Sequence, residues 1–158
     1  MRTEIICVGK IKEKFFKDAI SEYSKRLSKY VNLSIIEVSD EKTPESLSDS
    51  EKRIVKDKEG ERILNAVKTN FVIALDLSGK KLSSENFAEF LRKSMVSGIN
   101  GVSFVIGGSL GLSESVIKRA DLRLSFSDMT FPHQLMRVIL LEQIYRAHRI
   151  INNEPYHK

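Results

Sequence analysis

Short apolar runs, each about as long as one β-strand, recur along the chain and restrict its fold more than any other feature. Phe71–Leu75 is apolar at every position, and Val102–Ile106 is apolar except for its serine. A strand that is apolar on both faces must be covered on both faces by other elements. Strand-like runs also lie at Glu4–Val8, Leu33–Val38 and Leu122–Phe126. These runs predict a sheet that is buried from both sides.

Helical patterns lie between these runs. Apolar residues recur at helical spacing in Lys12–Lys29, and Ser50–Lys68 shows the same period with closely mixed charges that indicate a solvated outer face. Ser83 or Ser84 can cap a third helix, which Gly98 can end. Strands that alternate with helices predict an α/β fold with a mainly parallel sheet and helices on both faces.

The length and composition fit one domain that spans residues 1–158. A single cysteine excludes a disulfide framework and a cysteine cluster for a metal. No apolar run approaches the length of a membrane span, so we expect a cytoplasmic protein that does not contact a membrane. Lys and Arg outnumber Asp and Glu by 26 to 21. This excess is compatible with a polyanionic partner such as RNA, but ordinary enzymes share it.

A glycine-rich turn follows the fourth predicted strand. Gly107, Gly108 and Gly111 lack the Cβ atoms that would keep a ligand away from the backbone, and a helix can start near Ser113. Such a turn can hold polar or anionic groups on N–H donors. The spacing is not Gly-x-Gly-x-x-Gly and too little chain follows for a dinucleotide fold, which argues against a nicotinamide enzyme. A tight turn without a ligand remains an alternative.

The last strand leads through a short loop, Ser127–Phe131, into a long apolar helix. Thr130 can act as the N-cap, with Pro132 in the first turn. Leu135–Leu141 is apolar nearly all round and is interrupted chiefly by Arg137. A helix that is apolar on more than one face needs more cover than one sheet provides. We therefore expect another subunit to cover it.

Polar residues mark the far half of this helix and the end of the chain. Glu142, Arg146 and Arg149 lie on one side of the helix, either as surface ion pairs of small value or as the edge of a site. The closing segment 155–158 combines an aromatic ring, an imidazole and a cation, although frayed ends are the default for chain termini. The three histidines are not at metal-ligand spacing, so no metal site is expected.

Taken together, several long strings resemble a known family. They are FVIGGSLG at residues 104–111, LSFSDMTFPHQLMRV at 124–138, EQIYRA at 142–147 and PYHK at 155–158, with VGKIKE at 8–13 and KEGERIL at 58–64 as further matches. In this order they resemble the small SPOUT-class methyltransferases of the ribosomal RNA large-subunit methyltransferase H family. The likeness spans essentially the whole chain.

The resemblance implies an S-adenosylmethionine-dependent enzyme that methylates N3 of a pseudouridine in large-subunit (23S) ribosomal RNA, on the assembled ribosome. It also implies a SPOUT-like deep trefoil knot near the C-terminus and a homodimer whose sites lie at the interface. Ordinary rules of chain topology exclude knots, so the residue patterns alone would not predict one.

The resemblance also assigns site residues. The cofactor contacts that it implies are Leu75, Gly107, Gly108, Phe126, Ser127, Asp128, Met129, Thr130 and Phe131. Among these, Asp128 is the least expected to bind through its side chain, because backbone atoms of the loop can do so. His157 is the candidate for accepting the N3 proton, with Glu142 as a second candidate. Tyr156 would stack on or orient the base, and the candidates for RNA phosphates are Arg137, Arg146 and Lys158.

Two other functions stay open on the sequence. A ribosome- or RNA-associated protein could keep this fold without the chemistry, and a methyltransferase could act on a different substrate. Cofactor binding separates the first of these from an enzyme, and label transfer to ribosomes separates the second.

Overall fold

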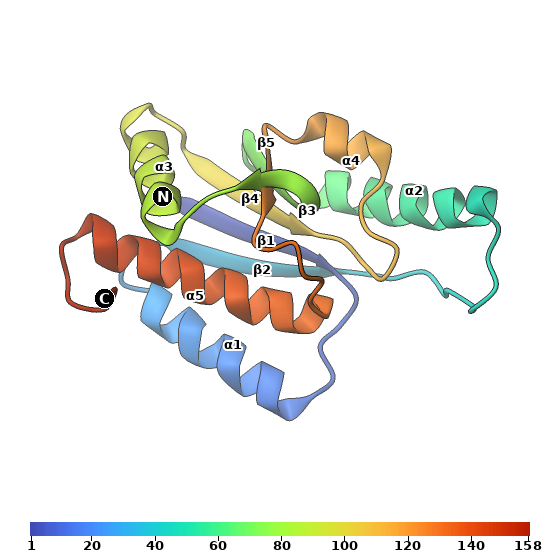
Figure 1. The fold of residues 1–158 in the computed structure, drawn as a ribbon, viewed down its shortest axis with the longest axis horizontal. Helices are drawn as coiled ribbons and strands as arrows, with labels where there is room; N and C mark the ends of the chain where they lie inside the picture. The colour runs from blue at the N-terminus through green and yellow to red at the C-terminus, as the bar shows by residue number, and fades with distance from the viewer.

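The computed structural model describes residues 1–158 and contains one five-stranded sheet. Its strands are β1 (Arg2–Val8), β2 (Asn32–Val38), β3 (Phe71–Lys81), β4 (Gly101–Ile106) and β5 (Leu122–Ser125). They lie in the order β2-β1-β4-β3-β5, and every neighbouring pair is parallel. All strands therefore end at the same edge of the sheet (Figure 1).

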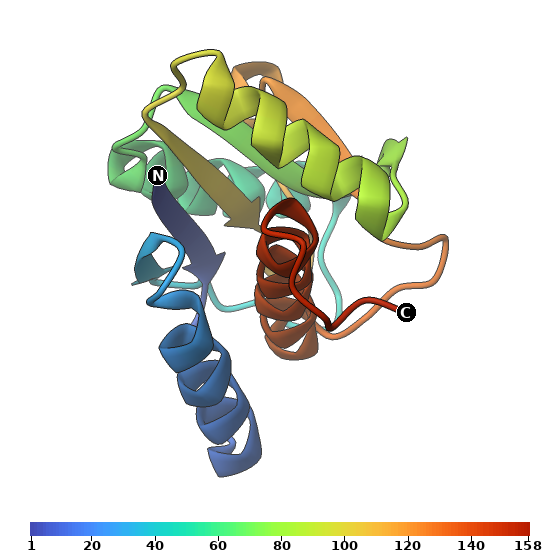
Figure 2. The ribbon, with the colours of Figure 1, turned by 90° about the vertical axis from the view of Figure 1, so that its left-hand side faces the viewer.

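Five helices cover the two faces of this sheet. They are α1 (Lys14–Leu27), α2 (Asp49–Ala66), α3 (Ser84–Val96), α4 (Glu114–Arg119) and α5 (His133–Ile151). On one face α5 lies between α1 and α3, while α2 and α4 lie on the other (Figures 1 and 2). The predicted α/β fold, with a parallel sheet and helices on both faces, is confirmed.

The core has two parts because strand side chains alternate between the faces. Ile5 of β1 belongs to the larger cluster, together with Leu140 of α5. Its neighbour Ile6 belongs to the smaller cluster, together with Ile63 of α2 and Val116 of α4. The central strands are thus apolar on both faces because helices pack on both, as their sequence predicts.

Local signals set most helix ends. The Ser83 hydroxyl accepts a hydrogen bond from the Asn86 amide at the start of α3, and Gly98 follows that helix with a φ of +80°, as a C-terminal glycine does. The prediction that Thr130 caps the last helix is wrong. That helix begins at His133, because Pro132 occupies the N-cap with extended backbone angles (φ −54°, ψ 138°).

Strand β3 runs farther than its apolar sequence predicts, to Lys81 rather than Leu75. Leu124 of β5 pairs with both Leu75 and Lys80, so the residues between these two bulge out of the strand. After β5, at the edge of the sheet, the chain returns to place α5 between α1 and α3. The trefoil knot stays a prediction. No helix combines the length and apolar content that a bilayer crossing requires.

Candidate active site

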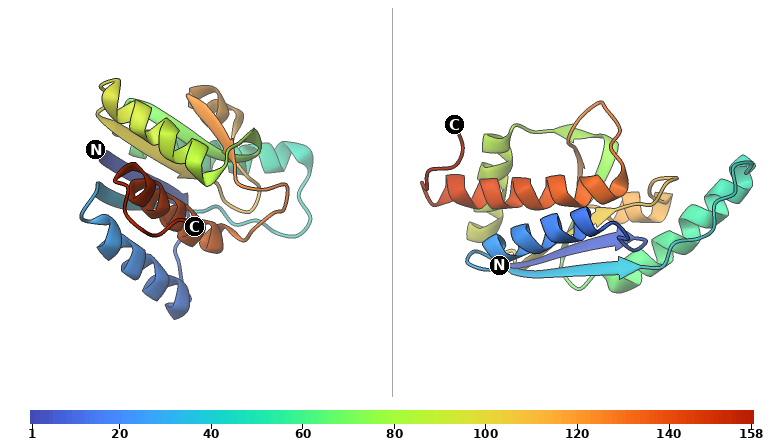
Figure 3. Two further views of the ribbon diagram at one scale, coloured as in Figure 1. Left: turned by 60° about the vertical axis from the view of Figure 1, so that its left-hand side comes forward. Right: turned by 90° about the horizontal axis from the view of Figure 1, so that it is seen from below.

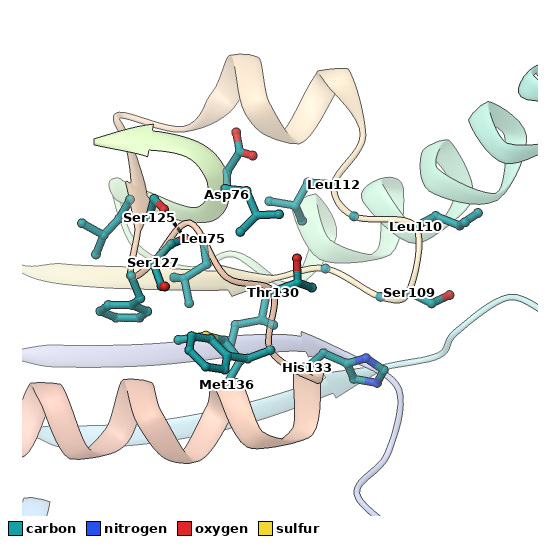
Figure 4. A pocket seen from close by; sticks show the side chains of 18 of the residues that line it. Leu75, Asp76, Ser109, Leu110, Leu112, Ser125, Ser127, Thr130, His133 and Met136 are labelled. Atoms are coloured by element: carbon teal, nitrogen blue, oxygen red, sulfur yellow. Dashed lines mark hydrogen bonds between the residues drawn. The ribbon is translucent and has the colours of Figure 1, made fainter. Parts of the chain in front are cut away.

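A pocket of about 390 Å³ lies at the carboxyl edge of the sheet. The bulged stretch of β3 and the loops that follow β4 and β5 surround it, and the first turn of α5 closes another side (Figure 4). Ligand sites in open α/β sheets form at this edge, where the chain leaves the strands. The two loops singled out in the sequence therefore meet at one cavity.

The predicted cofactor residues gather around this cavity with one exception. Those that line it are Leu75, Gly107, Gly108, Phe126, Ser127, Met129, Thr130 and Phe131. Asp128 does not line it, because its exposed side chain forms an ion pair with Lys81 outside the pocket. The structure thus brings the predicted segments together, and their contact with a cofactor stays a prediction.

Unpaired backbone donors surround the pocket. The N–H groups of Gly107, Ser109 and Leu110 donate to no group of the protein, whereas Gly108 forms an isolated antiparallel bridge with Gly111. In the loop after β5, Met129 donates to the Ser127 hydroxyl (3.0 Å), whereas other amides of that loop have no acceptor. Backbone N–H groups are strong donors that proteins seldom leave without a partner, so these amides can serve a bound ligand.

The glycine turn needs glycine at positions 107 and 111. A Cβ atom on Gly107 would lie 2.8 Å from the Gly111 carbonyl carbon, and Gly111 has a φ of +87°. The Gly111 amide donates to the Gly108 carbonyl at 3.0 Å, which closes the turn. The chain therefore makes a tight turn here, and the binding of a ligand by this turn stays a prediction.

The bulge in β3 supplies pocket residues that the sequence did not identify, among them Asp76 and Leu77. Arg123 of β5 donates to the Asp76 carboxylate through Nε at 2.8 Å, and Asp76 accepts from the Ser78 amide at 3.2 Å. These bonds hold the bulge in place. The two partners are far apart in the sequence, so no local pattern could have revealed the arrangement.

Residues of α5 also line the pocket and were not predicted as contacts, notably His133 and Met136 (Figure 4). Burial and the Arg137 guanidinium lower the pKa of His133, so this imidazole is neutral near pH 7. A neutral imidazole can offer the pocket one donor and one acceptor.

A buried carboxylate lies behind the glycine turn. Glu59 of α2 is 4% exposed, and its Oε1 accepts the Glu41 amide at 3.1 Å, while Oε2 has no partner. A Cβ on Gly108 would lie 3.0 Å from that Oε2 atom. Burial is the largest cause that raises the pKa of Glu59, and the nearby Asp40 charge adds to it.

The assignment of Arg137 to RNA phosphates is wrong. Its side chain is only 2% exposed, and it donates to the Val8 and Gly9 carbonyls (3.0 and 2.8 Å) and to Glu37 (2.7 Å). These bonds tie α5 to the end of β1. A buried cation that already donates to three internal acceptors cannot reach a phosphate. The sequence did contain a sign of this burial, because Arg137 is the main charged residue in an otherwise apolar stretch of helix, and such a charge usually has an internal partner.

The polar residues of the far half of α5 form a separate group with the end of the chain, which we call the tail cluster: Glu142, Arg146, Tyr156 and His157. Glu142 Oε1 accepts from Arg146 Nε (3.0 Å), Arg146 Nη2 (2.6 Å) and the Tyr156 hydroxyl (3.1 Å). The Arg146 guanidinium lies 4.7 Å from the centre of the Tyr156 ring. Burial and the Glu142 charge raise the pKa of Tyr156 to about 12. The tail is thus folded back on α5.

His157 is held between two charged side chains. Arg146 Nη1 lies 3.2 Å from its Nδ1 atom, and Glu85 Oε1 lies 2.7 Å from its Nε2 atom. Because guanidinium only donates and carboxylate only accepts, these partners assign the proton of the neutral ring to Nε2. The Nδ1 lone pair is then occupied by Arg146. Lys158, the last predicted RNA contact, is exposed.

The tail cluster and the pocket lie at different places along α5. None of the four cluster residues lines the pocket, and Glu142 is six residues beyond Met136, about 9 Å along the helix. Figure 3 shows the carboxyl terminus at the opposite end of α5 from the loop that enters this helix. Within one chain, the predicted base and the predicted cofactor residues are not brought together.

The full length of the chain matches known methyltransferases. A family model described as "Predicted SPOUT methyltransferase" matches residues 1–157. Proteins named "Ribosomal RNA large subunit methyltransferase H" are 62% identical in Clostridium botulinum and 58% identical in Clostridium beijerinckii. In both cases the match covers 100% of this chain and 100% of the relative.

Solved structures with much lower identity share the fold. A probable methylase family protein from Haemophilus influenzae has a TM-score of 0.55 at 13% identity, over 96% of this chain and 66% of that one. The putative methyltransferase Lpg2936 from Legionella pneumophila, solved with bound S-adenosylmethionine, has a TM-score of 0.50 at 11% identity, over 94% and 66%. This chain spans just under two thirds of each of these. By its family model and its full-length relatives, the chain belongs to the SPOUT methyltransferase family.

Proposed function

We propose that this protein is an S-adenosylmethionine-dependent methyltransferase that modifies N3 of a pseudouridine in large-subunit ribosomal RNA. The observation that carries the proposal is the 58–62% identity, over the full length, with proteins named for large-subunit ribosomal RNA methylation. The pseudouridine and the N3 atom come from the family resemblance and extend that observation. We infer that the reaction takes place in the cytoplasm, on the assembled ribosome.

The pocket has the chemistry that S-adenosylmethionine requires. Its apolar walls, which include Leu75, Ile106 and Leu124, suit the flat adenine ring, and the unpaired amides of the glycine turn suit polar groups of the cofactor. When bound, the cofactor supplies a methyl group activated by a positively charged sulfur. The protein's contribution is to hold that methyl in line with the attacking nitrogen and to keep water away.

Transfer requires one proton to leave. A base nitrogen that received the activated methyl group at N3 would give up its proton, and a side chain of the protein would accept that proton. His157 is the proposed acceptor and Glu142 the alternative. To act, His157 must exchange its contact with Arg146, which occupies Nδ1 in this arrangement. Arg146 would then be released toward the RNA phosphate for which we propose it.

We propose that the active enzyme is a homodimer in which the tail cluster of one copy completes the pocket of the other. The separation of these two groups along one α5 supports a second copy. Apolar side chains at the mouth of the pocket support it too, since Leu77, Met129 and Phe131 are 54%, 73% and 36% exposed. Exposed apolar groups beside a ligand site are typical of surfaces that another chain covers.

Methyl-label transfer tests this function. Purified protein and labelled S-adenosylmethionine would be incubated with intact ribosomes, with isolated large subunits, with protein-free ribosomal RNA and with a protein pool. The expected result is label in the ribosomal particles. Digestion of their RNA to nucleosides and mass spectrometry should identify the labelled nucleoside as N3-methylpseudouridine. Ribosome binding without saturable cofactor binding and without label in any RNA would instead indicate a noncatalytic ribosome-associated protein. Label in the protein pool alone would point to another substrate.

A further inference from the structure

A basic and aromatic surface follows β1 and has no part in the site described above. We call it the Lys–Phe patch and define it as Lys10, Lys12, Lys14, Phe15 and Lys17. All five side chains are exposed, and Phe15 is 66% exposed, among the most exposed large apolar residues of the protein. The patch is formed by the β1–α1 loop and the first turn of α1.

The loop that carries the first two lysines is fixed in place. Gly9 turns the chain with a φ of +83°, and its amide donates to the Val38 carbonyl at 2.8 Å. Ile11 is buried, and its amide donates to Glu37 Oε2 at 2.9 Å. Lys10 and Lys12 flank this anchor and are exposed on either side of it. A rigid loop presents its charges without the entropy cost of ordering a mobile segment.

Phe15 has no packing role that explains an aromatic ring. Residues of α1 that pack on the core are Ile20, Tyr23 and Leu27. The ring of Phe15 has an aromatic contact only with its neighbour Phe16, at 4.5 Å between centroids. An exposed ring at the start of a helix, surrounded by lysines, is the arrangement with which proteins stack an unpaired base and hold its phosphates.

The patch lies beside the pocket. Glu37, which accepts the Ile11 amide, also accepts a hydrogen bond from Arg137 of α5 at 2.7 Å. Arg137 lies one helical turn after the pocket residue His133. The charge of Glu13, in the patch loop, raises the pKa of His133 against the larger effect of burial. Two acids lie within the patch, Glu13 and Asp18, and Asp18 pairs with Lys14 at 2.7 Å. The remaining lysines leave the patch with a positive balance.

We propose that the Lys–Phe patch binds the ribosomal RNA next to the target nucleotide, with its lysines on phosphates and Phe15 stacked on an unpaired base. This inference rests on the proposed function and deepens it. A second protein chain fits the patch less well, because lysine is depleted in the buried centre of protein interfaces. RNA is the partner that uses both the charge and the ring.

Binding to large ribosomal subunits from a strain that lacks this protein tests the proposal. The dissociation constant would be measured over a range of salt concentrations for the wild type, Phe15→Ala, Phe15→Trp and the pair Lys10→Ala with Lys12→Ala. Phe15→Ala should weaken binding roughly tenfold with the same salt slope, and Phe15→Trp should bind as the wild type does. Loss of both lysines should reduce the slope of log affinity against log salt by about 1.5.

The matched control is the pair Lys25→Ala with Lys29→Ala, exposed lysines in the last turn of α1 and just beyond its end. This control pair should leave both the affinity and the salt slope close to the wild-type values. Calorimetry with S-adenosylmethionine should give wild-type affinity for every variant, which separates RNA contact from damage to the pocket. Wild-type binding by Phe15→Ala, or a loss of dimer mass by sedimentation, would overturn the proposal. If the wild type itself neither binds nor methylates the subunits, the proposed function fails instead.

Discussion

The pocket and the tail cluster both lie along α5, but they differ in whether their polar groups are already paired. Around the pocket, the amides of Gly107, Ser109 and Leu110 in the glycine turn have no acceptor within the protein. In the tail cluster, Glu142 accepts four hydrogen bonds, one of them from the Gln143 side chain, and both nitrogens of His157 have partners. The pocket is therefore ready to receive a ligand, whereas the tail must exchange partners before it can act.

The two regions also differ in what holds them. The donors of the pocket are backbone amides, positioned by the turn at Gly107 and by the bulge in β3, and apolar side chains form its walls. The tail cluster is built from side chains and is tied to the rest of the chain by Glu154, which accepts from the Tyr30 hydroxyl at 2.5 Å. We therefore expect substitutions in the pocket to weaken cofactor binding, and substitutions in the tail cluster to slow methyl transfer without weakening cofactor binding.

The largest effect is expected from Gly107→Val. The new side chain would collide with the backbone of Gly111, so the turn cannot keep its shape. Calorimetry should show no measurable S-adenosylmethionine binding, and methyl transfer should fall at least about a thousandfold, roughly 4 kcal/mol. Gly98→Asn is the control, because asparagine tolerates the left-handed backbone at a helix end and this residue is far from the pocket. Cofactor binding by the valine variant would contradict the proposed site.

A second prediction concerns acid stability on the tail side. Burial lowers the pKa of His148 to about 4, and its ring stacks on Tyr30 at 5.5 Å. The unfolded chain takes up this proton near pH 6.5, while the folded chain resists it until about pH 4. Stability is therefore lost as the pH falls between these values, by about 3 kcal/mol in total. His148→Phe keeps the stacking and should remove this loss in urea titrations at pH 7.5, 5.5 and 4.

His157→Ala should separate the two regions in function. Removing the proposed base should slow single-turnover methyl transfer about a hundredfold and change its dependence on pH. S-adenosylmethionine affinity should stay as in the wild type, since His157 does not line the pocket. Lys29→Ala serves as a control for surface substitution. Transfer at the wild-type rate across the pH range would remove His157 from the mechanism, and weaker cofactor binding would show that the regions are not separate.

The smallest effect is expected from Glu59→Gln, on the pocket side, and its sign is opposite to that of His148. Because burial raises the pKa of Glu59, the folded chain takes up this proton at a higher pH than the unfolded chain does. Its contribution to stability is present at low pH and is lost as the pH rises through the raised value. The glutamine variant should melt slightly above the wild type at pH 7.5 and equal to it near pH 4. A lower melting temperature at pH 7.5 would mean that the ionised carboxylate stabilises the fold.

The sequence predicts the elements better than their contacts. Apolar runs located the five strands, and serine and glycine signals such as Ser83 and Gly98 located helix ends, because these depend on neighbouring residues. The bulge in β3 was missed, since it depends on Arg123 reaching Asp76. The cap at Thr130 was wrong because Pro132, two residues later, fixes the backbone at the N-cap.

The candidate site divides in the same way. The loops after β4 and β5 were predicted to meet because parallel strands end at one edge, and they do. Arg137 was misassigned because a sequence shows a charge but not its burial. His133 and Met136 were missed as pocket residues because the direction in which α5 leaves the loop depends on packing between α1 and α3. The distance between tail and pocket has no local signal at all.

Mixing two defective variants tests most directly whether the pocket of one copy works with the tail of another. Gly107→Val and His157→Ala chains would be denatured together, refolded and assayed for methyl transfer to ribosomes. In a two-fold dimer, half of the mixed population carries one intact pairing of pocket and tail, so about a quarter of the wild-type activity should return. Refolded alone, the glycine variant should be inactive and the histidine variant should keep about 1% of the wild-type activity. If the mixture is no more active than the separate variants, the pocket of one copy does not work with the tail cluster of the other.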